Sequence, residues 1–550
     1  MNFLETIFAH LRQSAQRPVL QEMHADRAVP ATGGELLAQI QAARNFLRRA
    51  GLKKGDRCAL LAPNSIHWAA IDLAILAEGG IVVPLYARQA PDELVAMMKD
   101  ADPVMILCAD VSLRTNILRS WPAAPDCHIP KDIFSASAPP DTSIEPPLAL
   151  SGDSPVSIIY TSGTSGEPKG VVLTVANLNP ILECTTARLD LLMGRRNAPE
   201  QVFHYAPFCF AASWVLLLTC LLRNSLLSLS TDLANIASEM RRAAPDYFLN
   251  VPVMLERMRT KIEEQLAVRG GPVFWTFRAA EREWLRRAKG GRTRSGGFAL
   301  ALARSIVFPT IRKKLGPNLK ALICGSAPLP PDTQQCFLML GLPVLQVYGL
   351  TETTAICTMD TPGKIKPGWV GTAIEGIEMK LGEMDEILVR GPNVFPGYWN
   401  RDAATRDAIR GGWFHSGDQG EVSSDGYWRV TGRIKNLIVL ASGHNVAPEP
   451  IEEKLLHAIP GAQHVLIVGN GQGFLAALLT GEADEVAVKS ALEKLNADLP
   501  HYKRVHDFRI LPEPFTVDNG LLTANGKLKR DAIANRFQNT IEKLYRKQPA

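Results

Sequence analysis

An early stretch of the chain alternates between short apolar runs and helical patterns, and this alternation restricts the fold more than any other feature. The runs Arg57–Leu61, Ile81–Pro84 and Val104–Cys108 predict three buried strands. Ser65 can cap a helix after the first strand. Pro91 begins another helix, with acids in its first turn. Strands that alternate with helices in this way predict an α/β fold.

The organisation changes near Gly432, where a compact unit of strands and helices begins. At 550 residues the chain is too long for one ordinary core. We therefore predict a boundary between two domains, 1–432 and 433–550. Further strands are expected at 319–324, 344–348, 382–390, 427–430, 437–440, 464–468 and 474–480, helices at 448–456 and 486–495, and a loop at 126–147.

Composition excludes several classes of protein. Hydrophobic residues make up 46% and charged residues 21%, which is typical of a globular chain. A net charge of +5 is mild for this length, and no nucleic-acid recognition motif is present. The nine cysteines form no Cys-x-x-Cys pair, and the N-terminus is a poor signal peptide. We expect a reduced, cytoplasmic protein of unknown oligomeric state.

A loop rich in threonine, serine and glycine follows a predicted strand at Val156–Tyr160, and an apolar run resumes at Val171–Leu173. Small residues let backbone N–H groups converge, and hydroxyls and a lysine add donors, which suits an anionic ligand such as a triphosphate. The order Pro-Lys-Gly differs from the Walker loop. The alternative is an ordinary hairpin turn. The candidate ligand-binding residues are Thr161, Ser162, Gly163, Thr164, Ser165, Gly166 and Lys169.

Two other segments place candidate residues where predicted strands end. Ligands bind at such strand ends in α/β sheets. One strand leads to Tyr348, Gly349, Thr351 and Glu352. A carboxylate repels a triphosphate unless a divalent cation lies between them, so Glu352 is a candidate Mg²⁺ ligand, although a Thr-Glu helix cap is also consistent. The small residues of the other segment would let a flat base lie against the backbone: Gly325, Ser326 and Ala327.

Two charged residues sit in glycine-bearing turns. Asp418, in Gly412-Trp-Phe-His-Ser-Gly-Asp418, can accept both hydroxyls of a ribose, and the alternative is an Asx-turn. Lys527, in Gly520–Arg530, is a cation on a turn, which would be valuable where two anions meet, or else is merely solvated.

These segments, in this order, resemble the adenylate-forming (ANL) superfamily of acyl-CoA synthetases, adenylation domains and luciferases. The resemblance extends over essentially the whole chain and includes Thr431–Glu452. Asn250–Met258 and Asn445–Glu452 look most like the long-chain fatty acyl-CoA synthetase branch.

The resemblance implies a large N-terminal α/β assembly of subdomains and a small mobile C-terminal α+β domain. It also implies a two-step reaction with ATP, Mg²⁺ and coenzyme A. A carboxylic acid, expected to be a fatty acid, first forms an acyl-adenylate with release of pyrophosphate, and a thiol then attacks the adenylate. In this reaction the Thr161–Lys169 loop would bind the phosphates, Glu352 beside Thr351 would bind the metal, and Lys527 would contact the reaction centre. The nucleoside would be contacted at adenine by Tyr348, Gly349 and Gly325–Ala327, and at the ribose by Asp418 and Arg433. Lys435 would be the hinge, and Ser442 and Gly443 would form the turn on the thiol side.

The sequence departs from the family at Phe210, which stands where members often carry histidine, while His204 lies nearby at another position. Phe210 and Trp214 are candidate acyl-pocket residues. The apolar run Trp214–Leu222 is expected to be core for most of its length. Asn436 replaces an acid that often follows the hinge lysine.

Several alternatives remain open at this point. The acyl acceptor is either coenzyme A or the phosphopantetheine thiol of an acyl carrier protein. A nucleotide-binding sensor would leave the catalytic residues idle. The basic helical region at 250–315 is either a solvated face or a patch that touches anionic lipid headgroups.

Overall fold

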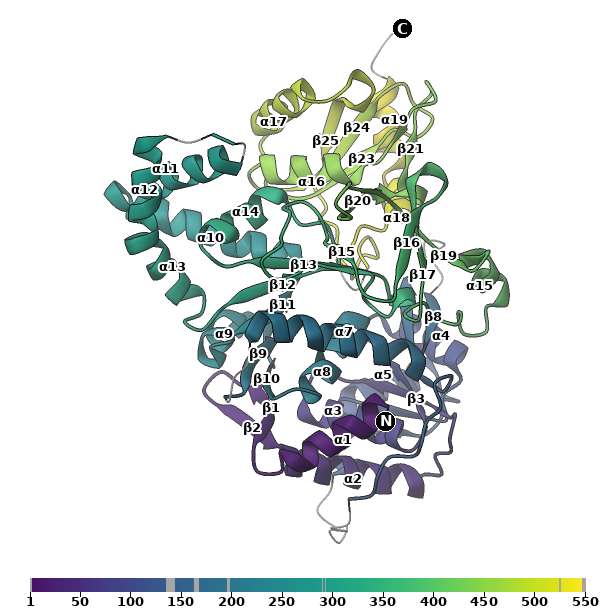
Figure 1. Cartoon of the computed structure of the whole chain (residues 1–550). Helices are drawn as coiled ribbons and strands as arrows, with labels where there is room; N and C mark the ends of the chain where they lie inside the picture. Colours follow the sequence, from purple (N-terminus) through teal and green to yellow (C-terminus); the bar gives the residue numbers. More distant parts are fainter. Residues whose placement is uncertain are drawn as a thin grey trace.

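The computed structural model describes residues 2–134, 144–162, 168–194, 198–288, 290–291, 293–523 and 526–546. It has the predicted α/β class, with a large N-terminal part and a smaller C-terminal unit (Figure 1). Sheets of six, nine and five strands form the larger part, and the smaller unit contains its own three-stranded sheet.

A six-stranded sheet, in the order β6-β5-β3-β4-β7-β8, carries the Thr/Ser/Gly loop. Its strands are parallel except for the last pair, β7 and β8, which are antiparallel. The predicted Ser65 cap is confirmed, because its hydroxyl accepts a hydrogen bond from the Trp68 backbone N–H at 3.0 Å. The elements are β3 (Arg57–Leu61), α3 (Ile66–Ala77), β4 (Ile81–Pro84), α4 (Pro91–Ala101), β5 (Met105–Cys108), α5 (Val111–Ser120), β6 (Cys127–His128), β7 (Pro155–Ser162) and β8 (Pro168–Thr174).

The prediction of an uninterrupted loop at 126–147 was wrong at its start. This stretch begins with β6 and the short helix α6 (Pro130–Ile133). Pro130 occupies the first helical position, and the Ile129 N–H donates to Asp132 Oδ2 at 3.0 Å. These local start signals act against the loop-like composition of the segment.

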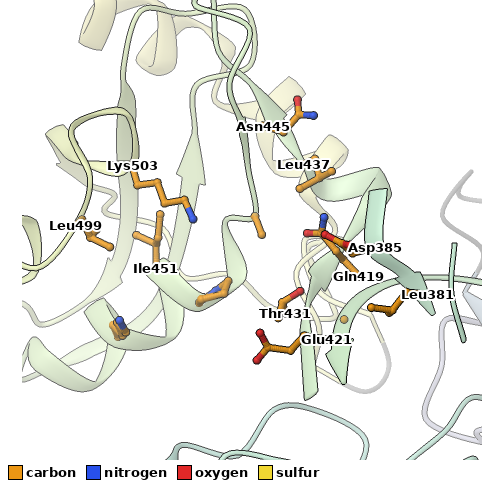
Figure 2. A pocket seen from close by; sticks show the side chains of 14 residues that line it. Leu381, Asp385, Gln419, Glu421, Thr431, Leu437, Asn445, Ile451, Leu499 and Lys503 are labelled. Carbon is orange, nitrogen blue, oxygen red and sulfur yellow. The ribbon is translucent and has the colours of Figure 1, made fainter. Parts of the chain in front are cut away.

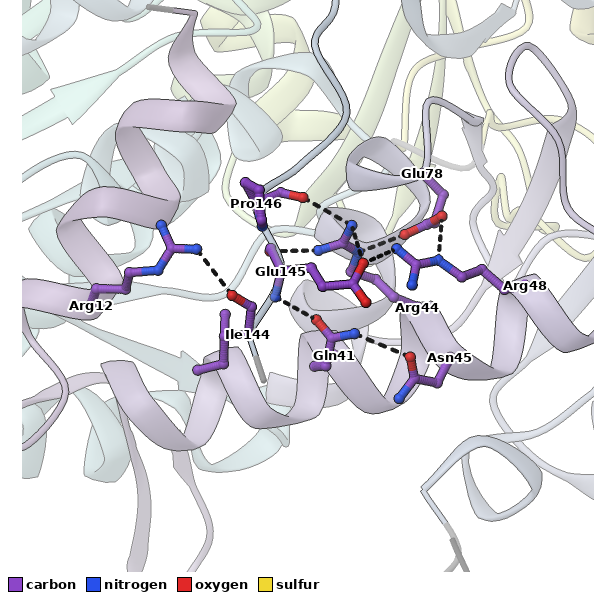
Figure 3. Close-up of polar contacts among 9 residues, drawn as sticks. All are labelled: Arg12, Gln41, Arg44, Asn45, Arg48, Glu78, Ile144, Glu145 and Pro146. Atoms are coloured by element: carbon purple, nitrogen blue, oxygen red, sulfur yellow. Dashed lines mark hydrogen bonds and ion pairs between the residues drawn. The ribbon is translucent and has the colours of Figure 1, made fainter. Parts of the chain in front are cut away.

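A buried arginine fixes the chain that approaches β7. Arg44, on α2 (Gly33–Arg49), is 1% exposed and its Nε lies 2.6 Å from Glu78 Oε1 (Figure 3). The same guanidinium donates to the carbonyl oxygens of Glu145 at 2.7 Å and Pro146 at 3.0 Å. Arg48 binds the other oxygen of Glu78 at 2.8 Å. The network therefore ties the segment before the β7–β8 hairpin to α2 and α3.

The nine-stranded sheet, in the order β15-β14-β13-β12-β11-β9-β10-β1-β2, brings two candidate segments to neighbouring strand ends. Strands β12 and β13 are parallel neighbours, and the Gly325 and Tyr348 segments lie at their carboxyl ends. The strands are β1 (Pro18–Met23), β2 (Ala28–Thr32), β9 (Glu200–His204), β10 (Ser225–Ser230), β11 (Tyr247–Asn250), β12 (Ala321–Cys324), β13 (Val344–Tyr348), β14 (Thr358–Met359) and β15 (Thr372–Ala373), and helices α1 (Phe3–Gln13), α7 (Val175–Met193), α8 (Ala211–Leu221), α9 (Ile236–Ala243) and α14 (Pro331–Met339) accompany them.

The basic region folds into helices at the outer edge of the molecule, as its pattern predicts (Figure 1). These are α10 (Pro252–Arg269), α11 (Gly271–Ala288), α12 (Arg294–Leu302), the π-helical turn η2 (Ala303–Val307) and α13 (Phe308–Leu315). Phe277 and Phe308 pack edge to face, 6.3 Å between ring centroids, in a core that also contains Leu322 and Val344. In the part of the chain that the structure describes, no helix is long and apolar enough to cross a membrane.

A five-stranded sheet precedes the C-terminal unit. The strand expected from Gly382 begins only at Glu386, because residues 383–385 form a 3₁₀ turn in which Met384 has a φ of 54°. The elements are β16 (Glu378–Leu381), β17 (Glu386–Arg390), α15 (Asp402–Ala408), β18 (Ile409–Arg410), β19 (Trp413–Val422) and β20 (Trp428–Arg433).

The C-terminal unit follows β20 through the 3₁₀ turn η5 (Ile434–Asn436). Its core gathers apolar residues of its own strands and helices, including Leu455, Leu479 and Val488. The elements are β21 (Ile438–Val439), β22 (Asn445–Val446), α16 (Glu449–Ala458), β23 (Ala462–Val468), β24 (Leu475–Gly481), α17 (Glu485–Ala497), β25 (Val505–Ile510), α18 (Arg530–Arg536) and α19 (Gln538–Arg546).

Candidate active site

The Thr/Ser/Gly loop joins the two strands of the β7–β8 hairpin. In the register, Thr161 lies opposite Lys169 and Ser162 opposite Pro168. Gly163, Thr164, Ser165 and Gly166 lie outside the described residues. A hairpin and an anion-binding loop are therefore compatible interpretations of this segment, because the loop connects paired strands.

A second segment packs alongside this hairpin. The Val172 N–H donates to the Gly397 carbonyl at 3.2 Å, and the Trp399 N–H donates to the Gly170 carbonyl at 2.7 Å. Gly170 must be small here, because an added Cβ would stand 2.6 Å from Ile158 Cγ2. The contact brings the ring of Tyr398 to 5.2 Å from Lys169 Nζ.

Tyr398 links the hairpin to Glu352, and sequence reasoning missed it. Its hydroxyl donates to Glu352 Oε1 at 2.9 Å, while the Phe395 N–H donates to the Glu352 carbonyl at 2.8 Å. The available signal was an aromatic pair after Pro396-Gly397, but nothing local connects that pair to Glu352.

Glu352 lies in the 3₁₀ turn η3 (Thr351–Thr353), directly beyond β13. Burial raises the pKa of its carboxyl, while Tyr398 and Arg433 act in the opposite direction. A desolvated carboxylate beside other anions is well suited to a divalent cation. Among the described residues, no group of three or more His, Cys, Asp and Glu side chains could hold a metal. The buried carboxylate of Glu352 therefore fits a divalent cation.

Asp418 is held between an arginine and a tyrosine. Asp418 lies on β19 opposite Arg433 on β20, and Arg433 Nε lies 2.9 Å from Asp418 Oδ1. The Tyr348 hydroxyl donates to Asp418 Oδ2 at 2.9 Å. Burial raises the pKa of Asp418, and Arg433 and Tyr348 oppose that shift. Both carboxylate oxygens therefore bind side chains of other strands, whereas in an Asx-turn the carboxylate would accept from a backbone N–H two residues on.

The two strand-end segments need glycine where the backbones approach. A Cβ on Gly325 would stand 2.7 Å from Val347 Cγ2, and a Cβ on Gly349 would stand 2.3 Å from the Ala355 carbonyl oxygen. Ser326 and Ala327 are exposed beyond β12, and Ser326 has a φ of 74°. The segment therefore offers a small-residue surface beside Tyr348.

Lys527 comes to this site from the C-terminal unit. Its turn is closed by hydrogen bonds from the Thr523 N–H to the Lys527 carbonyl (2.8 Å) and from the Lys527 N–H to Thr523 Oγ1 (3.0 Å). Desolvation lowers the pKa of the Lys527 ammonium group, the nearby charge of Arg433 lowers it further, and the charge of Asp418 raises it. Lys527 is therefore within electrostatic reach of the Asp418–Arg433 pair. Its side chain is nevertheless exposed.

Two ion pairs hold the C-terminal unit in this position. Lys529 Nζ lies 3.2 Å from Glu93 Oε1, and His457 Nε2 lies 2.9 Å from Glu256 Oε2. A cavity of about 490 Å³ is lined by residues of β19, β20 and α16 (Figure 2). Glu421 on β19 and Ile451 on α16 both line it.

The predicted hinge and thiol-side residues lie in the C-terminal unit. Lys435 is in η5, and its neighbour Asn436 donates to Glu449 Oε1 at 2.6 Å, which shows how an amide can hold the chain here. Ser442 and Gly443 form an exposed turn between β21 and β22, where the Gly443 N–H donates to the Leu440 carbonyl at 2.8 Å. This turn contacts its own unit and is not among the groups that surround Asp418.

The two candidate acyl-pocket residues differ in surroundings. Phe210 is half-buried at the start of α8, with its ring centroid 6.0 Å from that of Tyr86. Trp214 is 1% exposed within the main core, and its Nε1–H donates to Asp72 Oδ2 at 3.1 Å. Burial raises the pKa of Asp72 to about 7. His204 is also buried and stacks on Phe208, with 5.3 Å between centroids.

Curated relatives resemble the chain over its length. It is 28% identical, over 591 aligned residues, to the long-chain-fatty-acid–CoA ligase FadD15 of Mycobacterium bovis, covering 100% of this chain and 97% of that protein. It is 30% identical to the putative fatty-acid–CoA ligase fadD11 of Mycobacterium tuberculosis, covering 78% of this chain and 81% of that protein. The crystal structure of the anthranilate CoA ligase AuaEII with anthranoyl-AMP superposes with a TM-score of 0.75 at 20% identity, covering 98% and 97% of the two chains.

Family comparison agrees with the geometry and with the predicted resemblance. Residues 8–399 match the AMP-binding enzyme family, and residues 435–549 match the AMP-binding enzyme C-terminal domain. The chain is therefore a member of the AMP-binding enzyme family.

Proposed function

We propose that the protein is an AMP-forming acid–thiol ligase that activates a fatty acid with ATP and transfers the acyl group to coenzyme A. The observation that carries the proposal is the likeness of the chain to AMP-binding enzymes and fatty-acid–CoA ligases, together with the Asp418–Arg433 ion pair that lies within electrostatic reach of Lys527. In the first step, a carboxylate oxygen attacks the α-phosphorus of ATP, and pyrophosphate leaves. In the second step, a thiol sulfur attacks the acyl carbon, and AMP leaves.

Phosphate binding is assigned to the end of the β7–β8 hairpin, with Lys169 and the hydroxyls as donors. Bound Mg²⁺ would neutralise phosphate charge and supply electrophilic stabilisation. Glu352 would hold the metal, Tyr398 would orient Glu352, and Thr351 would lie beside them. Support comes from the hydrogen bond between Tyr398 and Glu352 and from the raised pKa of Glu352.

Nucleoside binding is assigned to the strand ends and to β19–β20. Tyr348 and Gly349 would contact adenine together with the surface formed by Gly325, Ser326 and Ala327. Asp418 would accept the ribose hydroxyls, and Arg433 would hold Asp418 ionised despite its burial. The close backbone approaches at Gly325 and Gly349 support a site shaped for a flat base.

Lys527 is assigned to the carboxylate and the α-phosphate during adenylation. A cation stabilises the charge that develops when two anions react. For thioester formation, we propose that the unit after residue 432 turns about Lys435, withdraws Lys527 and presents the Ser442–Gly443 turn to the thiol. The ion pairs that Glu93 and Glu256 form with the C-terminal unit are partly exposed and therefore weak, which supports a unit that can leave this position.

The acyl chain is assigned to the region behind Phe210. Trp214, which lies on α8 in the main core, would form part of the pocket wall. Coenzyme A is the proposed acceptor, and we propose a cytoplasmic enzyme whose basic helical region meets a membrane peripherally.

The test is pyrophosphate release from ATP with carboxylic acids of graded length, with and without coenzyme A. The expected result is turnover with long-chain acids that rises strongly with coenzyme A, as acyl-CoA accumulates. Turnover that requires an acyl carrier protein would replace the proposed acceptor. ATP binding without pyrophosphate release for any acid would overturn the proposed reaction. Lys489→Ala, on the remote helix α17, is the control for variants of Lys527.

A further inference from the structure

The outer helical layer contains a long stretch with charges of only one sign. Between Glu283 and Asp332 there is no acidic residue, while ten lysines and arginines occur. The whole chain has a net charge of only +5, so the remaining residues carry a net charge of −5. Nine of the ten cations precede Gly316, so positive charge is concentrated in the segment that contains α11, α12 and α13.

Most described cations of this stretch lack an acidic partner. Arg286 and Arg287 both pair with Glu283. Arg304 instead lies over the Trp284 ring, 5.8 Å from its centroid. Among the described residues, no acidic side chain forms an ion pair with Arg304 or with the exposed cluster Arg312, Lys313 and Lys314. These cations are available to an external anionic surface.

The same layer exposes a stripe of large apolar side chains. Phe298, Leu302 and Ile306 recur every four residues along α12 and η2, and they are 72%, 37% and 59% exposed. The opposite side of these helices carries buried Leu300, Ala303 and Val307, which are part of the core. The helix is thus apolar on two sides, and only one of them is covered by the protein.

We propose that the Phe298–Leu302–Ile306 stripe inserts into the headgroup region of an anionic lipid bilayer, with Lys313 and Lys314 binding the lipid phosphates. Apolar residues at an interface gain by leaving water, and each nearby cation adds attraction to anionic lipid. This occupant is favoured over a soluble acidic partner because α12, which carries Phe298 and Leu302, lies at the outer edge of the molecule (Figure 1) and exposes them together with Ile306. A merely solvated face would not require three large apolar side chains in register.

This inference rests on the membrane contact proposed for the ligase and names its residues and lipid class. Lipid binding at this layer would also place the enzyme where long-chain acids accumulate. Because binding is measured without acid, ATP or coenzyme A, a failure here would leave the proposed reaction untouched, and a failure of the reaction would leave this result untouched.

The first test measures binding to vesicles of phosphatidylcholine, with or without phosphatidylglycerol as about a third of the lipid. Wild-type protein is expected to bind the anionic vesicles at least tenfold more tightly, and salt should weaken that binding. Lys313→Glu/Lys314→Glu should lose about tenfold or more in affinity. The matched control Lys489→Glu/Lys494→Glu reverses two exposed charges on α17 and should bind as wild type does.

The second test examines insertion. Phe298→Ser/Ile306→Ser should weaken binding to anionic vesicles about tenfold, whereas Val486→Ser, at a 71% exposed site on α17, should not. A tryptophan introduced as Phe298→Trp should be quenched by brominated lipid on binding, and one introduced as Val486→Trp should not. Equal affinity for the two vesicle types, unchanged binding of the serine variant, or binding to an acidic carrier protein but not to vesicles would overturn the proposal.

Discussion

His457 on α16 and Glu256 on α10 form an ion pair between the C-terminal unit and the larger part of the protein, with 2.9 Å between Nε2 and Oε2. The hydrogen bond to Glu256 is the main cause of a raised pKa at His457, and burial opposes it. Glu453 also faces this imidazole and stabilises its charged form. The contact joins two units that the proposed mechanism requires to move.

The first prediction concerns pH. Since the folded pKa of His457 is raised, its contribution to holding the unit is complete below the ordinary histidine pKa and is lost as pH rises through the raised value. Adenylation relative to thioester formation should fall over that range by a few-fold, because the pair is partly exposed. Half-reactions measured from pH 6 to 8.5 provide the test. His457→Gln should flatten the profile and His501→Gln should not; a profile unchanged by His457→Gln would contradict the prediction.

Lys527→Ala should reduce adenylation by about a hundredfold or more, because the reacting anions would lose their cation. Thioester formation from supplied acyl-adenylate should change far less. Single-turnover assays of the two half-reactions separate these effects. Equal losses in both half-reactions would sink the role of Lys527. Lys529→Ala, which removes the Glu93 ion pair, should slow adenylation only a few-fold.

Tyr398→Phe should raise the Mg²⁺ concentration needed for half-maximal pyrophosphate release by about three- to tenfold, because partners that orient a metal-binding carboxylate affect metal affinity. The lost hydrogen bond also removes an influence that lowers the pKa of Glu352, so the defect should deepen at acidic pH. Tyr427→Phe removes a hydroxyl that donates to the Lys364 carbonyl away from Glu352 and is the control. A normal Mg²⁺ dependence in Tyr398→Phe would argue against this role.

Arg44→Met should lower the free energy of unfolding by about 3–5 kcal/mol, because Glu78 would be left buried without its main partner. Arg48→Met, whose side chain is much more exposed, should cost about 1 kcal/mol or less. Urea unfolding of the N-terminal transition provides the measurement. The double variant Arg44→Met/Glu78→Met should be more stable than Arg44→Met; if it is less stable, the buried pair is not the cause.

Sequence patterns predicted the elements that depend on local signals. Strands such as β3 and β4 are short apolar runs that are buried at every position except Arg57, and α4 begins at a proline followed by acids, so their positions followed directly. The 126–147 stretch shows the limit of composition, because Asp132 caps a short helix inside a segment that otherwise has the composition of a loop.

The contacts that assemble the candidate site were not predictable in the same way. Glu352 and Asp418 were chosen for their chemistry, but the hydroxyls that hold them come from Tyr398 and Tyr348, 46 and 70 residues away in the sequence. Such pairs depend on how β13, β19 and the segment before α15 pack together. The pairing of Trp399 with Gly170 is likewise a tertiary contact that no local periodicity encodes.

The uneven charge of the outer helical layer gives the molecule an electric dipole. Outside 284–331 the chain has 50 basic and 55 acidic residues, so its two regions have opposite sign. Near an anionic surface, the field of the surface exerts a torque on this dipole. The torque turns the α11–α13 side toward the surface before any side chain touches lipid. At physiological salt this torque acts only within about 8 Å of the surface. Salt should therefore slow the encounter itself, and the molecule should arrive with a defined orientation.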